Sequence, residues 1–213
     1  MVRIDEKLED YRNLILAMAN RVLTMYKSAV ECAKTGDVEL ALYIIHTDEF
    51  VNNNEFEIND KALEFLALLA PVASDLRLVL CGIKIVNDLE RIGDYAKNVA
   101  QYVIKYGKLS EEILPFLDQI ADVFFAMFEQ TMEAYRKLDA DLAFEIPELD
   151  KKIDETIMEL YDFVDKQIDQ LKARADLSQV MSVLRCFERA GDHTKNINEH
   201  IIYQVKGQHY DFG

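Results

Sequence analysis

The amino-acid sequence predicts an all-α protein made of two tandem three-helix bundles. Half of its 213 residues are apolar, and only three prolines and seven glycines interrupt them, a composition that suits long helices. Apolar residues recur every three or four positions along most of the chain, which is the period of an amphipathic helix. A polar motif near residue 90 returns 98 residues later, which indicates an internal duplication. We therefore expect six long helices, with the two sets of three related by a pseudo-twofold.

Residues 1–107 form the first predicted repeat, and its helices end at glycine or proline signals. The three expected helices cover about residues 5–34, 38–69 and 75–106. Asp37 lies directly before the second helix, where its side chain can accept from the first free N–H groups. Asn52 to Asn54 stand in the middle of that helix. Because asparagine is a poor interior helix former, strict continuity is left open at this point.

Residues 108–213 form the second predicted repeat and follow the same plan. The three expected helices cover about residues 110–138, 141–172 and 176–206. Ser110 is the expected cap of the first of them, and Pro115 is expected to bend it just past its first turn. Pro147 should kink the next helix or mark its true start. The C-terminal tail around His209 is expected to be disordered.

The third and the last helix are expected to join the two repeats. The first half of the third helix carries a second apolar row beside the one that faces its own bundle, and a helix that is apolar on two sides is buried on two sides. A matching row lies on the last helix. The rows are Leu76, Val79, Leu80, Ile83 and Val86 on the third helix and Leu177, Met181 and Leu184 on the last. We expect them to meet across the pseudo-twofold.

The charge balance favours cations as ligands. The chain has 24 Lys and Arg against 39 Asp and Glu, a net charge of −15, and its isoelectric point is about 4.7. Nucleic acids and anionic membrane surfaces are bound through stripes of Lys and Arg, so neither is an expected partner. The same negative charge disfavours unaided binding of free phosphate.

The cysteines and the N-terminus point to an intracellular protein. Cys32, Cys81 and Cys186 are odd in number and lie far apart in apolar helical patterns, so buried reduced thiols are expected rather than disulfides. The N-terminal segment is too charged for a signal peptide. No apolar run approaches the roughly 18 residues of a membrane span. We expect a soluble, cytoplasmic protein.

The duplicated motif reads DLERIGDYAKN from Asp88 and FERAGDHTKN from Phe187. Each copy places two carboxylates four residues apart, on one face of a helix and about one turn from each other. These carboxylates are Glu90 and Asp94 in the first copy and Glu188 and Asp192 in the second.

Such a pair can be a solvated helix face or half of a metal site. In the first interpretation the carboxylates form short-range ion pairs with Arg91 and Lys97, or with Arg189 and Lys195, each worth a few tenths of a kcal/mol. Duplication of polar, outward-facing residues weakens this interpretation, because a duplicated core would need only apolar periodicity.

A metal site also requires ligands from a neighbouring helix, since hard cations bind four to eight donors, mostly oxygen. Asp150 and Asp154 are four residues apart in the second helix of the second repeat. The corresponding positions of the first repeat are Asp48 and Asn52. Because Asn52 is a weaker, neutral ligand, the first site is expected to bind metal less tightly than the second.

The segments from Pro71 to Gln101 and from Phe187 to Ile201 resemble the PhoU family of phosphate-uptake regulators. The resemblance implies two tandem three-helix bundles that bind multinuclear clusters of transition-metal ions, iron or zinc first among them, through E(D)xxxD motifs. Carried over by position, the implied metal ligands are Asp48, Glu90, Asp94, Asp150, Asp154, Glu188 and Asp192. Asn52 departs from the family pattern and puts full occupancy of the first site in question.

The same resemblance implies a regulatory role. PhoU proteins restrain the phosphate-starvation response, acting between the phosphate ABC transporter and a sensor histidine kinase, and they limit phosphate import. A homodimer is expected as well.

Enzymatic chemistry is not expected. Ferritin-like di-iron oxidases require Glu-x-x-His pairs, and no histidine of this chain has a glutamate three residues before it. The chain also lacks a glycine-rich phosphate loop and a triad-like arrangement of serine and histidine. His193, next to Asp192, could be an additional metal ligand or an ordinary surface histidine. The alternatives to a metal-binding adaptor are a structural interaction module without a specific metal and, more distantly, a carboxylate-bridged metalloenzyme.

Overall fold

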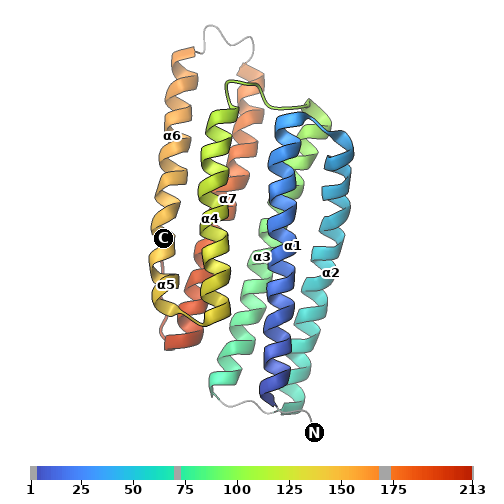
Figure 1. The fold of residues 1–213 in the computed structure, drawn as a ribbon, viewed down its shortest axis with the longest axis vertical. Coiled ribbons are helices and arrows are strands. Elements are labelled where there is room, and N and C mark those ends of the chain that lie inside the picture. The colour runs from blue at the N-terminus through green and yellow to red at the C-terminus, as the bar shows by residue number, and fades with distance from the viewer. Residues whose placement is uncertain (1–3, 70–72, 168–173, 213) are drawn as a thin grey trace.

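The computed structural model describes residues 4–69, 73–167 and 174–212, and within these ranges the secondary structure is entirely helical. The elements are α1 (Ile4–Thr35), α2 (Val38–Leu69), α3 (Ala73–Tyr106), α4 (Leu114–Lys137), α5 (Ala140–Glu145), the 3-10 helix η1 (Ile146–Leu149), α6 (Asp150–Gln167) and α7 (Arg174–Lys206). Figure 1 shows them as two elongated three-helix bundles side by side, with α5, η1 and α6 together in the place of one long helix. The predicted all-α tandem repeat is confirmed.

The ends of the helices follow the sequence signals in the first repeat. Gly36 has a positive φ of 75°, and Asp37 Oδ1 accepts from the Leu40 N–H at 3.0 Å, so the predicted cap is present. Helix α2 continues without a break through Asn52–Asn54. The three asparagines therefore do not interrupt the helix, because packing of its apolar face outweighs their low propensity.

Two expectations for the second repeat were wrong at the residue level. Ser110 does not cap a helix, since α4 begins at Leu114 and has no side-chain cap. Pro115 then lies in the first turn, where its missing N–H has no intrahelical partner to lose, so it starts the helix instead of bending it. Pro147 does break its helix, as predicted, into α5, η1 and α6.

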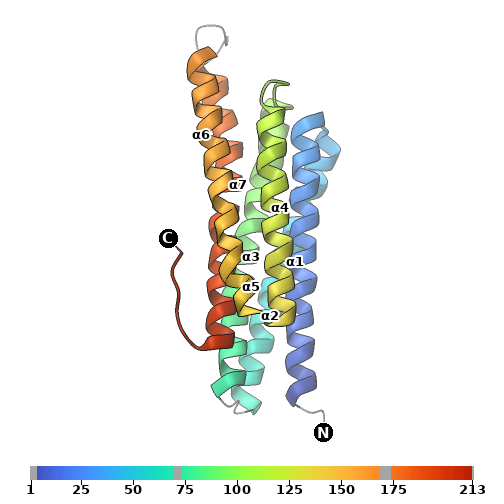
Figure 2. The ribbon, with the colours of Figure 1, turned by 60° about the vertical axis from the view of Figure 1, so that its left-hand side comes forward.

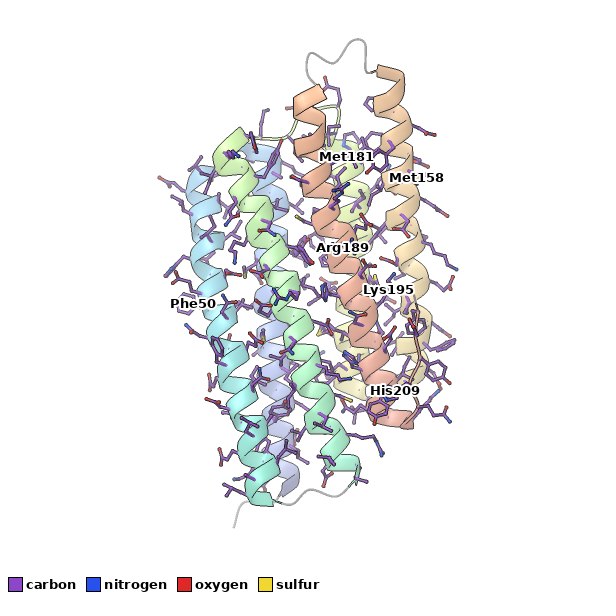
Figure 3. The ribbon with its side chains drawn as sticks, turned by 180° about the vertical axis from the view of Figure 1, so that it is seen from behind. Phe50, Met158, Met181, Arg189, Lys195 and His209 are labelled. Atoms are coloured by element: carbon purple, nitrogen blue, oxygen red, sulfur yellow. The ribbon has the colours of Figure 1, made fainter. Side chains whose placement is uncertain are left out.

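The helices form two layers. Figure 3 shows α2, α3, α7 and α6 in one row, with α1 and α4 behind them, and Figure 2 shows the same arrangement from the side. Contacts between the repeats are made mainly by α3 with α7 and, in the second layer, by α1 with α4. In that layer Tyr26 packs on Phe124, which stands 98 residues later in the chain, with ring centroids 4.6 Å apart. Residues at equivalent positions thus meet across the pseudo-twofold.

The apolar rows expected to join α3 and α7 are buried only in part. Leu76 and Leu80 are 38 % and 42 % exposed, whereas Met181 and Leu184 are buried. The side chain of Leu177 lies outside the described residues. The pairing of α3 with α7 was predicted correctly. Within the predicted row on α3, Val79 and Val86 are buried and Ile83 packs against the core, so only Leu76 and Leu80 depart from the prediction.

The C-terminal tail packs against the body, contrary to expectation. The Phe212 N–H donates to Glu199 Oε1 at 2.9 Å, and the His209 ring stacks on Tyr203 with centroids 3.9 Å apart. Figure 3 labels His209 near the end of α7. Phe144 of α5 also contacts the Phe212 ring, with centroids 5.7 Å apart. Aromatic residues of the tail therefore cover the end of the second bundle.

The three cysteines are buried and free of disulfide bonds, as predicted. Burial raises the pKa of the Cys32 thiol to about 11 and that of Cys186 to about 12, so neither is a reactive thiolate at neutral pH. Among the described helices, none is both long and apolar enough to cross a membrane.

Candidate metal centres between neighbouring helices

In the first repeat the acidic motif of α3 faces the middle of α2. Asp48 of α2 is only 3 % exposed. The Lys97 ammonium lies between the helices, with its Nζ 2.7 Å from Asp48 Oδ2 and 2.5 Å from Asp94 Oδ1. Glu90 belongs to the same cluster, because the charges of Asp94 and Asp48 both raise its pKa. Asp48 and Asp94 therefore meet at one positive charge, and Glu90 lies close enough to interact with both carboxylates.

The second repeat has the same arrangement between α6 and α7. Lys195 Nζ lies 2.8 Å from Asp150 Oδ2 and 3.1 Å from Asp192 Oδ1. Asp150 is 6 % exposed. The charges of Glu188 and Asp192 raise the pKa of Asp154, so these groups share one electrostatic environment. All four predicted ligands of this site are brought together.

The sequence suggested a role for the lysines only within their own helices, and the structure gives them a larger one. Lys97 and Lys195 each link two helices of a bundle, in addition to pairing with the aspartate three residues earlier. The arginines of the motif do behave as predicted for a solvated face. Arg91 pairs with Asp94 and Arg189 with Asp192 at 3.3 and 3.4 Å, and their side chains are 59 % and 62 % exposed.

The negative charge of both sites is incompletely compensated. Burial is the largest cause that raises the pKa of Glu90, and the Asp94 carboxylate raises it further. Burial also raises the pKa of Asp150 and Asp154, although the Lys195 ammonium opposes it. A raised pKa means that burial and like charges disfavour the charged carboxylate more than its partners stabilise it. Both sites would therefore gain from additional positive charge.

The first site contains a carboxylate that motif matching missed. Glu55 follows Asp48 by seven residues, two helical turns along the same face of α2. Its charge raises the pKa of Glu90. Asn87 of α3, in the amide orientation that satisfies both of its polar atoms, donates to Glu55 Oε1 at 3.0 Å. The spacing from Asp48 was a usable sequence signal, and with Glu55 the first site has as many carboxylates as the second.

The donor atoms of the sites suit an oxygen-binding cation. Asp48 Oδ1 and Asn52 Oδ1 are buried acceptors that find no hydrogen-bond partner within the described residues. Unpaired buried oxygens are uncommon, and these two are free to accept from a cation or a water molecule. In the second site, Gly191 provides the space that Asp150 occupies, since a Cβ added there would overlap Asp150 Oδ1. Hard and borderline metal ions accept such a set of oxygens.

The carboxylates of each site do not surround a common point at which a metal ion could bind. In the parts of the chain that the structure describes, no three or more His, Cys, Asp or Glu side chains form a group that could hold a metal ion as they stand. In each site the lysine ammonium, rather than a shared vacancy, lies where the carboxylates of two helices converge. Metal binding would require these side chains to regroup.

A surface hollow opens beside the second site. It has a volume of about 550 Å³. Its lining residues come from α6 and α7 and are Asp154, Ile157, Met158, Tyr161, Arg185, Glu188 and Arg189. Figure 3 labels Met158 and Arg189 on these two helices. Because two of the predicted ligands line the hollow, solvent and small ions have access to that site.

A second polar cluster joins the two repeats and was not predicted. Asp88 of α3 is 8 % exposed, and its Oδ1 lies 2.8 Å from His193 Nδ1 of α7. Its Oδ2 lies 3.3 Å from His200 Nε2, and Asn196 donates to Oδ1 at 3.4 Å. His193 therefore turns toward Asp88 and the other repeat rather than serving as a surface residue. No duplication could reveal this cluster, because Cys186 stands where a repeat of Asp88 would be.

These features define the class of the protein: an all-α tandem repeat in which each bundle carries an acidic motif facing a neighbouring helix. The PhoU domain model matches the chain twice, over residues 15–103 and 117–201. A curated relative, the phosphate-specific transport system accessory protein PhoU homolog of Pseudomonas aeruginosa, is 33 % identical over 208 residues, covering 96 % of this chain and 86 % of the relative. PhoU of Escherichia coli K12 is 29 % identical over 214 residues, covering 98 % and 87 %.

Solved structures agree with the sequence comparisons. The phosphate transport system regulatory protein PhoU from Streptococcus pneumoniae superposes with a TM-score of 0.90 at 26 % identity, covering 99 % of this chain and 100 % of that one. PhoU from Pseudomonas aeruginosa superposes with a TM-score of 0.89 at 32 % identity, covering 97 % and 100 %. The chain belongs to the PhoU family of phosphate-transport accessory and regulatory proteins.

Proposed function

We propose that this protein is a metal-binding adaptor that restrains the phosphate-starvation response and limits import by a phosphate ABC transporter. Its relatives are named accessory proteins of the phosphate-specific transport system. The proposed partners are that transporter and a sensor histidine kinase, the proposed location is the cytoplasm, and the proposed assembly is a homodimer. A protein of this kind acts through binding, and we propose no catalytic activity.

One observation carries the metal-binding part of the proposal. In each repeat, carboxylates from two helices converge on a single positive charge. Asp48, Glu55, Glu90 and Asp94 would hold a metal ion in the first site, with the unpaired Asn52 Oδ1 as a neutral donor. Asp150, Asp154, Glu188 and Asp192 would hold one in the second. A bound divalent ion would supply the compensating charge that these carboxylates lack.

Elemental analysis after reconstitution with iron or zinc tests this part. The wild type should retain metal at or above one atom per chain. A variant with Glu188→Ala and Asp192→Ala should lose the share bound by the second repeat, and one with Glu90→Ala and Asp94→Ala the share bound by the first. The matched control is Glu155→Ala with Glu159→Ala, two exposed carboxylates at the same spacing on α6. Equal metal loss from the control would mean nonspecific binding to an acidic surface.

The regulatory part is tested in cells. In a host whose own PhoU gene is deleted, a reporter of phosphate starvation should be repressed again when this chain is expressed in phosphate-rich medium. The four-residue variant that lacks both acidic pairs should fail to repress although it is present at the same level. A wild-type chain that leaves the reporter fully active would contradict the proposal.

A specific observation also favours the alternative of an interaction module without a specific metal. Lys97 and Lys195 already neutralise part of each acidic cluster, so the carboxylates have a cationic partner without any ion. Wild-type protein that stays empty after reconstitution, yet restores repression in the reporter assay, would establish this alternative.

A further inference from the structure

We propose that Lys97 and Lys195 are the resident cations of the two sites, and that each lysine leaves its carboxylates when they bind a divalent metal ion. The lysines would then set the metal affinity of the protein. This inference rests on the proposed metal-binding function and adds a competitor that is built into the chain.

The geometry of the two lysines carries the inference. Each ammonium lies within 3.1 Å of carboxylate oxygens from two different helices, and the two lysines occupy equivalent positions of the duplicated motif. Their side chains are 22 % and 15 % exposed, so most of each is withdrawn from water. An ordinary surface lysine of a helix would make one local ion pair and remain mobile. Both repeats place the motif lysine between two helices, although the facing helix is the unbroken α2 in one and α6 in the other.

The ammonium and a metal ion require the same oxygen atoms. Lys97 uses Asp48 Oδ2 and Asp94 Oδ1, one oxygen from each helix that would contribute to the first site. Transition metals bind carboxylate oxygens at about 2.0–2.2 Å, so an ion held by both groups would lie where the ammonium now lies. Two positive charges at that separation repel each other strongly in a partly buried site. The two occupants are therefore mutually exclusive.

The charge balance explains how one lysine can regulate a cluster. Each site combines four carboxylates with two cationic side chains, one lysine and one arginine. When the lysine departs, the site retains three uncompensated negative charges, which is more than one divalent ion neutralises. The lysine stem is long and flexible, so the ammonium can swing into water without moving the helix. Release of the lysine thus opens the site to more than one ion.

The first test replaces the lysines by an uncharged side chain of similar length. Lys97→Met and Lys195→Met should each bind Zn²⁺ about tenfold more tightly in calorimetric titrations, which corresponds to about 1.4 kcal/mol. Lys84→Met, at an exposed position of α3, is the matched control and should bind like the wild type. Unchanged Zn²⁺ affinity in both lysine variants would overturn the inference and leave the proposed function intact.

The second test follows the lysines directly and needs no activity. Amine-reactive labelling, quantified by mass spectrometry, should modify Lys97 and Lys195 several-fold faster in Zn²⁺-saturated wild type than in metal-free protein, with Lys84 unchanged. Equal labelling in protein shown to contain Zn²⁺ would overturn the inference. If the wild type binds no Zn²⁺ but the methionine variants do, the inference holds and the proposed function fails. If none of these proteins binds Zn²⁺, both fail.

Discussion

The two repeats build the same site on different second helices. Helix α2 runs unbroken over 32 residues, whereas its counterpart is divided at Pro147 into α5, η1 and α6. The motif lysines are 98 residues apart, whereas Asp150 follows Asp48 by 102 residues. Both aspartates nevertheless contact the lysine of their own repeat. The contact between carboxylate and lysine is therefore independent of how the supporting helix begins.

The remaining predicted ligands differ in their position along the second helix. The first repeat has Asn52 and Glu55 where the second has Asp154 and Ile157 at the equivalent positions. One carboxylate has shifted by about a turn, and the number of carboxylates has stayed the same. This difference teaches that the charge of the site is maintained while individual positions vary. The expectation from Asn52 that the first site binds metal less tightly stays a prediction, and Glu55 is the residue that would offset the missing aspartate.

The largest expected difference between the repeats concerns the glycine of the motif. Gly191→Ala would place a Cβ against Asp150 Oδ1, so the carboxylate must leave its position beside Lys195. We expect a net loss of about 1–2 kcal/mol in the free energy of unfolding, measured by urea denaturation, because the displaced carboxylate loses its partner while alanine regains up to about 1 kcal/mol of helix propensity. Gly93→Ala is the matched change in the first repeat. Its new Cβ would lie 3.3 Å from Val51 Cγ1, so we expect a change within about 1 kcal/mol. Equal losses would show that the two glycines have the same role.

The next prediction separates the acidic sites from the junction between the repeats. Burial raises the pKa of Asp88, but the hydrogen bonds from His193 and His200 outweigh it, so the pKa lies below its ordinary value. A lowered pKa means that the charged form is preferred in the folded state, and this stability is present above the ordinary pKa near 3.9 and lost as the pH falls through the lower folded value.

Asp88→Asn should therefore lower the free energy of unfolding by about 1–2 kcal/mol at pH 7, and by progressively less below about pH 4. Denaturation at a series of pH values measures this profile. Asp122→Asn, an exposed change on α4, serves as the control and should show no such dependence. A penalty for Asp88→Asn that is constant from pH 7 to pH 3 would refute the role of its charge.

The fold and the two motifs were predictable because they depend on local and periodic features. Helices follow from apolar spacing, and Glu90, Asp94, Glu188 and Asp192 follow from a duplication that is visible in the sequence. Within one helix, spacing also pairs each motif lysine with the aspartate three residues before it.

Contacts between helices were not predictable in the same way. The attachment of Lys97 to Asp48 depends on how α3 is rotated against α2, and the motif alone does not fix that rotation. The contacts of Asp88 with His193 and His200 have no counterpart elsewhere in the duplicated motif, so comparison of the two repeats could not predict them. For Leu76 and Leu80 a contact was predicted that the structure does not have. An apolar row on a helix does not reveal whether a partner covers it.

A smaller effect is expected from the shifted carboxylate of the first site. In a background where Glu188→Ala and Asp192→Ala remove the second site, Glu55→Gln should weaken Zn²⁺ binding by up to about tenfold, because one charged donor is lost. Calorimetric titration measures the affinity. Glu57→Gln, an exposed change two residues further along α2, is the control. Identical affinities for the two variants would place Glu55 outside the site and support the expectation that the first site is the poorer one.

The smallest expected effect exchanges the residues that distinguish the repeats. Burial and the charges of Glu188 and Asp192 raise the pKa of Asp154 although Lys195 lowers it, so its charged form disfavours folding above the ordinary pKa. Asp154→Asn should therefore stabilise metal-free protein at pH 7, by about 0.5 kcal/mol or less because water screens this exposed group, and should have no effect at pH 3. Asn52→Asp should do the reverse in the first repeat.

With Zn²⁺ present, the sign of the stability change should invert for both substitutions, since each carboxylate then contributes to binding. Thermal melts with and without Zn²⁺ measure this inversion. Signs that stay the same would mean that these two positions differ in electrostatics alone and do not contribute to a metal site.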